Sequence, residues 1–164
     1  MGYNKRNDEI NALTKESIAM AYYKLLQSNS NISVSMICET AGVSRNAYYR
    51  NFASTDDIII YGLILKWAQY CEENPLPPDD NEAVKQQLIQ FFYAEKEFIR
   101  AIKQHNKVYL IEELFRTVII PAEDIGIEKY LLYVVAYAVY GMIRAMIDND
   151  FSETPEQILS LKKS

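Results

Sequence analysis

The stretch SVSMICETAGVSRNAYYRNF, residues 33–52, decides the fold. Its first half carries apolar residues at helical spacing, and Gly42 follows them where a left-handed residue would end a helix. Ser44 then offers a hydroxyl that can cap the first backbone N–H groups of a new helix. The pattern predicts one helix from about Ser33 to Ala41 and a second over Arg45–Asn51. Two short helices joined by a glycine-containing turn are typical of a helix-turn-helix, whose second helix lies in the DNA major groove.

The second of these helices divides into two sides. At about 100° per residue, Tyr48 and Phe52 fall on one arc and are expected to point inward, as an aromatic core. The opposite arc is a polar fan of Arg45, Asn46, Tyr49 and Arg50. Arginine can pair with guanine, asparagine with adenine, and a tyrosine hydroxyl can reach a phosphate, so this fan suits DNA. A short exposed helix can also be polar simply because it faces water, and the residues alone leave this alternative open.

Outward from this stretch, the chain has the periodicity of an all-α protein. Glycine and proline are few, and the apolar residues between them recur about every 3.6 positions. A capping pair, Ser54 and Asp57, starts a helix that runs toward Cys71, and the prolines of residues 74–80 interrupt the chain after it. Further helices are predicted over residues 13–27, 82–93, 95–104, 108–119 and 127–149, with a last one opened by TPEQ at 154–157. We expect an N-terminal three-helix DNA-binding domain over residues 1–55 and a helical ligand-binding and dimerisation domain over residues 56–164.

Charge separates the same two regions. The net charge of −5 argues against a protein that coats nucleic acid indiscriminately. Residues 1–55 nevertheless carry six basic against four acidic side chains, whereas residues 56–164 carry eleven against eighteen. The basic excess therefore lies with the predicted helix-turn-helix.

Composition excludes several classes of protein. Cys38 and Cys71 form no CxxC pair and the chain has one histidine, so we expect no metal site, no disulfide framework and a cytoplasmic location. That histidine, His105, lies at a predicted helix end, where a cation is favourable. No nucleophile-elbow, phosphate-loop or zinc-protease motif is present, so we expect neither an enzyme nor a cofactor. The charge-free run Tyr130–Ile143 has 14 residues, short of the roughly 20 that span a bilayer, and we expect it to form a buried helix.

The run from Ile32 to Leu63 resembles the DNA-binding domain of the TetR/AcrR family of bacterial transcription regulators. The residues that carry the resemblance are Ala41, Gly42, Val43, Ser44, Tyr49, Phe52, Ser54, Asp57 and Ile58. The resemblance implies contacts to DNA from Ser33, Ser35, Ser44, Arg45, Asn46, Tyr49, Arg50 and Asn51. Thr55 stands where the family usually has a lysine, and its hydroxyl and the backbone N–H groups there can still bind a phosphate.

For the whole chain, the resemblance implies an effector-responsive repressor that binds a palindromic operator as a cytoplasmic homodimer. Thr55 and the modest basic charge motivate an alternative. In this alternative the protein has the shape of such a regulator, does not bind DNA itself and acts through a partner protein.

The long predicted helix of the second domain carries two stripes of residues. Small residues recur along one line and predict the close approach of a second subunit, at Val134, Ala138, Gly141 and Ala145. A neighbouring line holds four tyrosines, which either pack in the core or form one wall of a pocket for a small apolar or aromatic effector: Tyr130, Tyr133, Tyr137 and Tyr140. The residues we expect to line such a pocket are Trp67, Phe92, Phe98, Tyr109, Phe115 and Tyr137.

Overall fold

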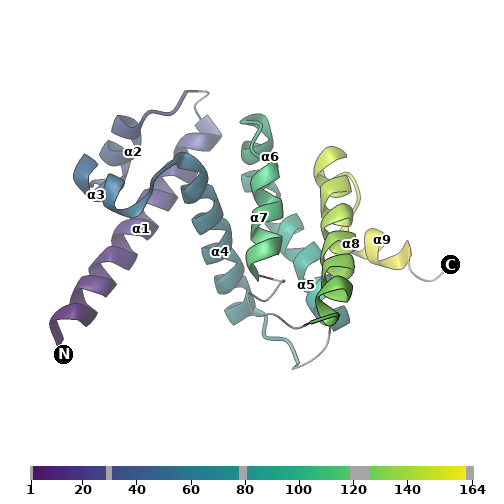
Figure 1. The fold of residues 1–164 in the computed structure, drawn as a ribbon. Coiled ribbons are helices and arrows are strands. Elements are labelled where there is room, and N and C mark those ends of the chain that lie inside the picture. The colour runs from purple at the N-terminus through teal and green to yellow at the C-terminus, as the bar shows by residue number, and fades with distance from the viewer. Residues whose placement is uncertain (1, 29–30, 78–80, 119–125, 162–164) are drawn as a thin grey trace. The chain divides into compact units, whose positions relative to one another are not determined.

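The computed structural model describes residues 2–28, 31–77, 81–118 and 126–161, which form helices and connecting turns without any strand (Figure 1). The expected all-α class is confirmed for this part of the chain. Two compact units are present, Met1–Leu63 and Ile64–Ser164, and each is described by itself. The boundary lies within helix α4 (Thr55–Glu73) rather than at its start, because the first turns of α4 pack in the first unit. There, the ring of Tyr61 lies 5.7 Å from that of Phe52.

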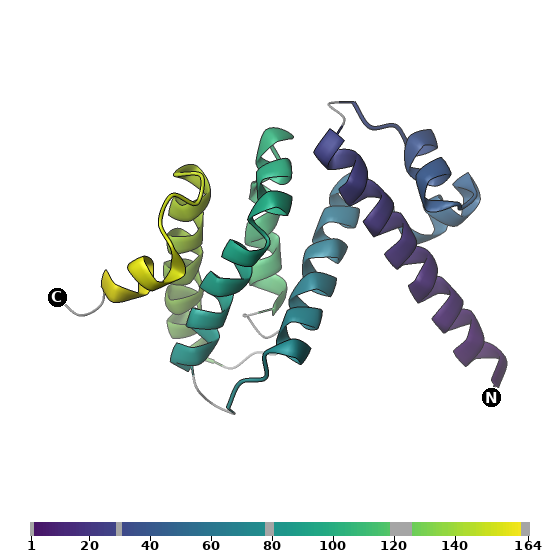
Figure 2. The ribbon, with the colours of Figure 1, turned by 180° about the vertical axis from the view of Figure 1, so that it is seen from behind.

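The first unit is built around a long helix, α1 (Gly2–Ser28), with α2 (Val34–Ala41) and α3 (Arg45–Asn51) packed on it and on each other. The N-terminal turns of α1 extend beyond α2 and α3 in both views (Figures 1 and 2). Side chains from all three helices and the start of α4 fill the core: Ile18, Tyr22, Leu26, Ile37, Tyr48, Phe52, Ile58 and Leu63. The helix α1 begins well before the predicted residue 13, and α2 and α3 have the predicted bounds to within one residue.

The second unit holds the rest of α4 and the helices α5 (Asn81–Ala94), α6 (Lys96–Gln104), α7 (Tyr109–Val118), α8 (Glu128–Asp148) and α9 (Pro155–Ser160). Helix α8 contacts α5, α6 and α7, and α9 contacts α5. Thr154 and Gln157 form the capping box that starts α9, as the TPEQ sequence predicts. Phenylalanine rings join α5 to α7 in this unit, since the ring of Phe92 stacks on that of Phe115 with centroids 6.0 Å apart.

Two cations of α6 fix the C-terminal end of α8. The ammonium group of Lys103 donates to the carbonyl of Ile147 at 2.6 Å. The guanidinium of Arg100 donates to the carbonyl of Asp150 at 2.9 Å and to its carboxylate at 3.0 Å. The carbonyl of Ile147 also accepts from the backbone N–H of Asp150 at 3.2 Å, so Lys103 adds a charged donor at the C-terminal end of α8, where a cation is favourable. The end of α8 is therefore held against α6.

The prediction that the run Tyr130–Ile143 is buried is wrong for much of α8. Only one face of this helix is buried, at Ala136, Val139, Ile143, Met146 and Ile147. The other described helices that contact α8 lie against this face, and the apolar residues between its members point to solvent. Among the described residues, α8 alone is long and apolar enough to cross a membrane by length and composition, a property that core helices of other proteins share.

Candidate functional site

A serine hydroxyl caps the N-terminal end of each of the helices α2 and α3. The hydroxyl of Ser33 accepts from the backbone N–H of Met36 at 3.3 Å, and the hydroxyl of Ser44 accepts from that of Ala47 at 3.1 Å. Gly42 has φ = 67°, a left-handed conformation that side chains disfavour. Ser33 and Ser44 thus act first as helix caps. Each hydroxyl still has a hydrogen that it can donate to a phosphate.

The adjacent tyrosines of α3 lie in different environments. Tyr48 is 1% exposed, whereas Tyr49 is 62% exposed, and their rings meet edge to face at 5.2 Å. Burial raises the pKa of the Tyr48 hydroxyl above its usual value, as expected of a core group. The helical wheel predicts this division. Tyr48 therefore holds α3 to the unit, and Tyr49 presents its ring and hydroxyl to solvent.

The exposed side of α3 carries the four residues that the wheel predicts, and we call it the α3 fan: Arg45, Asn46, Tyr49 and Arg50. The guanidinium of Arg45 donates a hydrogen bond to the hydroxyl of Ser35 on α2, so two residues expected to contact DNA separately also bind each other. Asn51 differs from the fan, because it is half-buried and its amide nitrogen donates to the carbonyl of Ala47 at 2.7 Å. Its amide is thus partly used within its own helix.

The start of α4 is less suited to a phosphate than the sequence predicts. The carboxylate of Asp57 accepts from the backbone N–H groups of Ala53 at 3.1 Å and Ser54 at 2.8 Å. The hydroxyl of Ser54 accepts in return from the N–H of Asp57 at 3.2 Å, which completes a capping box. A negative charge therefore already lies at this helix end, beside the half-buried Thr55, and would repel a phosphate there.

The predicted small-residue stripe lies on the exposed side of α8. Val134, Ala138, Gly141 and Ala145 are all exposed, and nothing lies within 4 Å of where a Cβ on Gly141 would be. With two neighbouring exposed residues they form one arc of the helix, which we call the α8 apolar face: Leu131, Val134, Val135, Ala138, Gly141 and Ala145.

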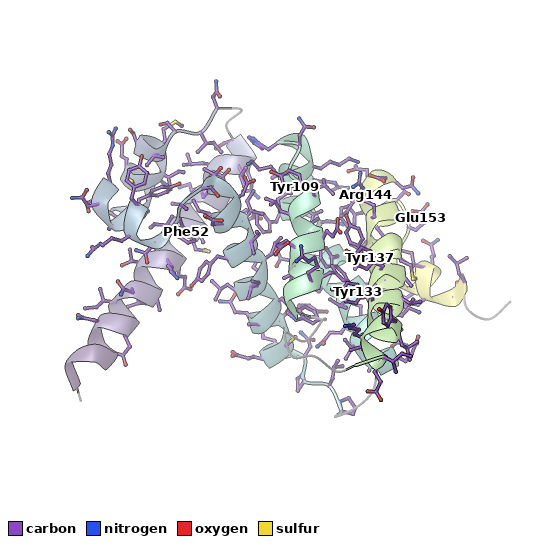
Figure 3. All side chains as sticks on the ribbon, in the orientation of Figure 1. Phe52, Tyr109, Tyr133, Tyr137, Arg144 and Glu153 are labelled. Carbon is purple, nitrogen blue, oxygen red and sulfur yellow. The ribbon has the colours of Figure 1, made fainter. Side chains whose placement is uncertain are left out.

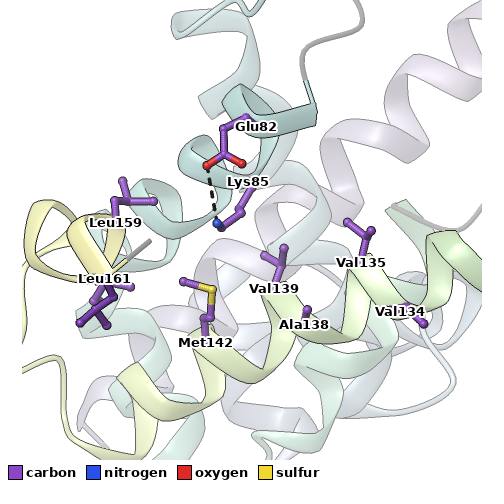
Figure 4. A pocket seen from close by; sticks show the side chains of 10 residues that line it. Glu82, Lys85, Val134, Val135, Ala138, Val139, Met142, Leu159 and Leu161 are labelled. Carbon is purple, nitrogen blue, oxygen red and sulfur yellow. Dashed lines mark ion pairs between the residues drawn. The ribbon is translucent and has the colours of Figure 1, made fainter. Parts of the chain in front are cut away.

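A groove borders the α8 apolar face (Figure 4). It has a volume of about 610 Å³. The residues that line it come from α5, α8 and the C-terminal segment, and they are apolar except for the ion pair of Glu82 with Lys85. The lining residues are Glu82, Lys85, Val134, Val135, Ala138, Val139, Met142, Ile158, Leu159 and Leu161. Val134, Val135 and Ala138 belong to both features. Sequence periodicity marks the residues of α8 but gives no sign that α9 lies beside them.

The six residues expected to line an effector pocket differ widely in burial. Phe92, Phe98 and Phe115 are almost fully buried, while Tyr109 and Tyr137 are 56% and 40% exposed. Trp67 is half-buried and packs edge to face on Phe91 at 5.2 Å. None of the six lines the groove of Figure 4. Phe92 on α5 and Phe115 on α7 stack at 6.0 Å, so two of the six meet in the core of this unit. That the six residues line an effector pocket stays a prediction.

The tyrosine stripe of α8 is neither core nor the wall of that groove. Tyr130, Tyr133 and Tyr137 are exposed and Tyr140 is half-buried. Figure 3 shows Tyr133 and Tyr137 on α8, with Tyr137 on the side of α7. The hydroxyl of Tyr137 donates to the carboxylate of Glu112 on α7 at 2.6 Å. This hydrogen bond, then desolvation and the negative charge of Glu112, raise the pKa of Tyr137.

Comparison with known proteins adds no relative. No protein-family model matches the chain, and no curated protein matches its sequence. The surfaces of the described residues that bear on function are the α3 fan in the first unit and the α8 apolar face in the second.

Proposed function

We propose that this protein is a DNA-binding transcription regulator that acts as a homodimer. In this proposal α2, the turn at Gly42 and α3 form a helix-turn-helix, and α3 enters the major groove. The observation that carries the proposal is the division of α3 into a buried Tyr48 and an exposed fan on a helix capped by Ser44. A helix that is fixed on one side and presents arginine, asparagine and tyrosine on the other has the chemistry that groove reading needs.

In this proposal the position of each residue of the α3 fan decides whether it contacts bases or phosphates. Recognition helices contact base edges mainly with their N-terminal residues, and Arg45 and Asn46 are the first two residues of α3. Arginine binds the guanine O6 and N7 acceptors with two donors, and asparagine pairs with the adenine edge. Tyr49 and the capping serines offer hydroxyl hydrogens to phosphates, which fix the register of the protein on DNA without reading sequence.

The α8 apolar face supports the homodimer. Val134 is 66% exposed and Leu131 is 67% exposed, and a contiguous exposed apolar patch commonly marks an interface. The small side chains at Ala138, Gly141 and Ala145 allow the backbone of a second helix to come close. A twofold dimer would present two copies of α3 to half-sites about 34 Å apart, or a multiple of that distance.

Regulation by an effector follows from linkage. A ligand that prefers a conformation with the wrong spacing of the two recognition helices lowers operator affinity by the ratio of its affinities for the two conformations. We propose a repressor of this kind, acting in the cytoplasm, with the effector unidentified.

The experiment starts from a random pool of DNA duplexes, because the operator is unknown. Repeated selection on the purified full-length protein, followed by fluorescence anisotropy on the enriched duplex, gives a dissociation constant at several salt concentrations. We expect sequence-specific binding below about 1 μM that weakens steeply as salt rises. The variant Arg45→Ala with Asn46→Ala serves as the control for non-specific binding.

Failure to enrich any sequence, with no specific binding at any salt concentration, would overturn the proposal. The protein-interaction alternative then takes its place, and Asp57 at the start of α4 is the observation that favours it. In that case the variant with Arg45→Ala and Asn46→Ala would still bind the same partner protein as wild type.

A further inference from the structure

The first unit contains a polar cleft between α1, α3 and α4, which shares Arg50 with the α3 fan. It has a volume of about 490 Å³. Three helices contribute its walls, with Asn11, Ala12 and Lys15 from α1, Arg50 and Asn51 from α3, and Tyr61 from α4. The sequence does not predict a binding role for Asn11 or Lys15, because the periodicity of α1 does not show that its exposed side meets the end of α3.

Both charged residues that line the cleft are cations. Among the described residues, neither Lys15 nor Arg50 forms an ion pair, and no carboxylate lines the cleft. The ammonium group of Lys15 lies 5.8 Å from the ring centroid of Tyr61. Burial, and then the negative charge of Glu16 on α1, raise the pKa of Tyr61. A cleft lined by one sign of charge concentrates its field and attracts the opposite sign.

This local charge is not a consequence of a basic unit. Residues 1–63 contain six basic and six acidic side chains, so the unit as a whole is balanced. Asn11, Asn51 and Tyr61 add neutral donors beside the two cations: amide hydrogens and a phenol hydrogen. Two cations with several neutral donors around one opening match the charge and the acceptor oxygens of a phosphate group.

We propose that this cleft binds a phosphate group, and that in the complex with DNA it holds a backbone phosphate beside the bases that α3 reads. The assignment to DNA rests on the proposed function. Arg45 and Arg50 are five residues apart, which is about 7.5 Å along a helix. Because the major groove is about 12 Å wide, a helix that reads bases with its first residues brings its last ones near a bounding strand. Arg50 on α3 and Lys15 on α1 then both bind a phosphate of that strand.

A charge-matched pair of variants tests the proposal. Lys15→Gln removes a cation from the cleft, and Lys24→Gln removes one from the opposite side of α1, nine residues or about 180° further on. The enriched duplex and an unrelated duplex are titrated at several salt concentrations by anisotropy, with thermal unfolding as the check on folding. For Lys15→Gln we expect the slope of log affinity against log salt to fall by about 0.9 per bound subunit. At about 0.15 M salt the release of one counterion is worth roughly a fivefold loss per subunit, equal on both duplexes.

The control decides what each result means. Lys24→Gln should keep the wild-type slope. Equal losses in the two variants would show a general charge effect and overturn the cleft, as would an unchanged slope in Lys15→Gln. Either result leaves the proposed function standing, because wild type still binds its selected sequence.

A second arm needs no DNA and separates a free phosphate from a backbone phosphate. Inorganic phosphate and a mononucleotide are titrated into wild type and Lys15→Gln while backbone amide NMR shifts are followed at Ala12 and Asn51. If wild type binds no DNA, the proposed function fails, and saturable shifts that Lys15→Gln abolishes then assign the cleft to a free phosphorylated molecule. The absence of both DNA binding and saturable shifts overturns the cleft together with the function.

Discussion

The α3 fan and the α8 apolar face are both exposed helix surfaces, yet they are exposed for different reasons. The α3 fan is polar, lies on a seven-residue helix, and is held by a serine cap and the buried ring of Tyr48. The α8 apolar face lies on a 21-residue helix and is exposed because the helices that contact α8 lie against its other side. The first surface is stable in water as it stands, whereas the second lowers its free energy by becoming buried. Exposure therefore points to a polar, charged partner in one unit and to an apolar partner in the other.

A charge placed on the α8 apolar face should have the largest effect on the two surfaces. Ala138→Glu would bury an unpaired carboxylate in the proposed dimer, at a cost of at least about 3 kcal/mol, or roughly a hundredfold in the dissociation constant. Sedimentation should show a monomer where wild type shows a dimer. Gln104→Glu, which adds the same charge at an exposed position of α6, should remain dimeric. A dimer of unchanged affinity in Ala138→Glu would remove this face from the interface.

The next largest effect concerns the α3 fan. Arg45→Ala should lower affinity for the selected duplex about 10- to 100-fold and relax the preference at one base pair, because it removes a bidentate contact. Arg45→Lys keeps the charge without the paired donors, so it should lose the same preference while keeping more of the salt dependence. Anisotropy on a set of single-base variants of the duplex measures both. If Arg45→Ala retained the wild-type preference, the orientation assigned to α3 would be incorrect.

Replacing a glycine by alanine should have opposite effects on the free energy of unfolding in the two regions. Gly42→Ala forces a side chain into a left-handed conformation and should lower the free energy of unfolding by about 1 kcal/mol, although nothing lies within 4 Å of the new Cβ. Gly141→Ala, in an open position on α8, should raise it by about 0.5–1 kcal/mol. Urea denaturation in the Ala138→Glu background compares the two without a contribution from association. Effects of the same sign would contradict the backbone conformation at one of these glycines.

The smallest expected effect concerns the hydrogen bond from Tyr137 to Glu112, beside the α8 apolar face. The pKa of Tyr137 is raised mainly by its hydrogen bond to Glu112, so the neutral phenol is the form that the folded chain favours. This stabilisation is complete below the usual pKa of 10.0 and is lost as pH rises through the higher folded value. The free energy of unfolding, measured across this alkaline range, should fall less steeply with pH in Tyr137→Phe than in wild type. Tyr133→Phe, at a ring that stacks on Tyr137 at 6.2 Å, is the control and should stay close to wild type, because Tyr133 is the smallest of the causes that raise the pKa of Tyr137.

The parts of the structure that sequence predicts well are those set by neighbouring residues. Helix α3 has the predicted bounds because Ser44 caps it and Gly42 ends the helix before it, and both effects act within four residues. The inward Tyr48 and outward Tyr49 follow from the same short period.

The parts that sequence predicts poorly depend on which distant segments meet. Periodicity shows that α8 has more than one apolar side, and it marks the small-residue stripe for a second subunit, but it does not show which sides the helices of its own unit cover. The same limit applies to Phe92 and Phe115, which come from separate helices and fill the core between them. The cleft at Lys15 and Arg50 is also an encounter of distant helices.

The hydrogen bond from Arg45 to Ser35 bears on the entropy of recognition. A free arginine on a helix surface samples many rotamers, and immobilising such a side chain on binding costs about 0.5–1.5 kcal/mol. In this chain the guanidinium is already tethered to α2 before any DNA is present. Part of that ordering cost is therefore met during folding rather than during binding. The first reading side chain would meet each candidate base pair in a preset geometry, so a wrong base would be rejected on contact, before the arginine could search for another fit.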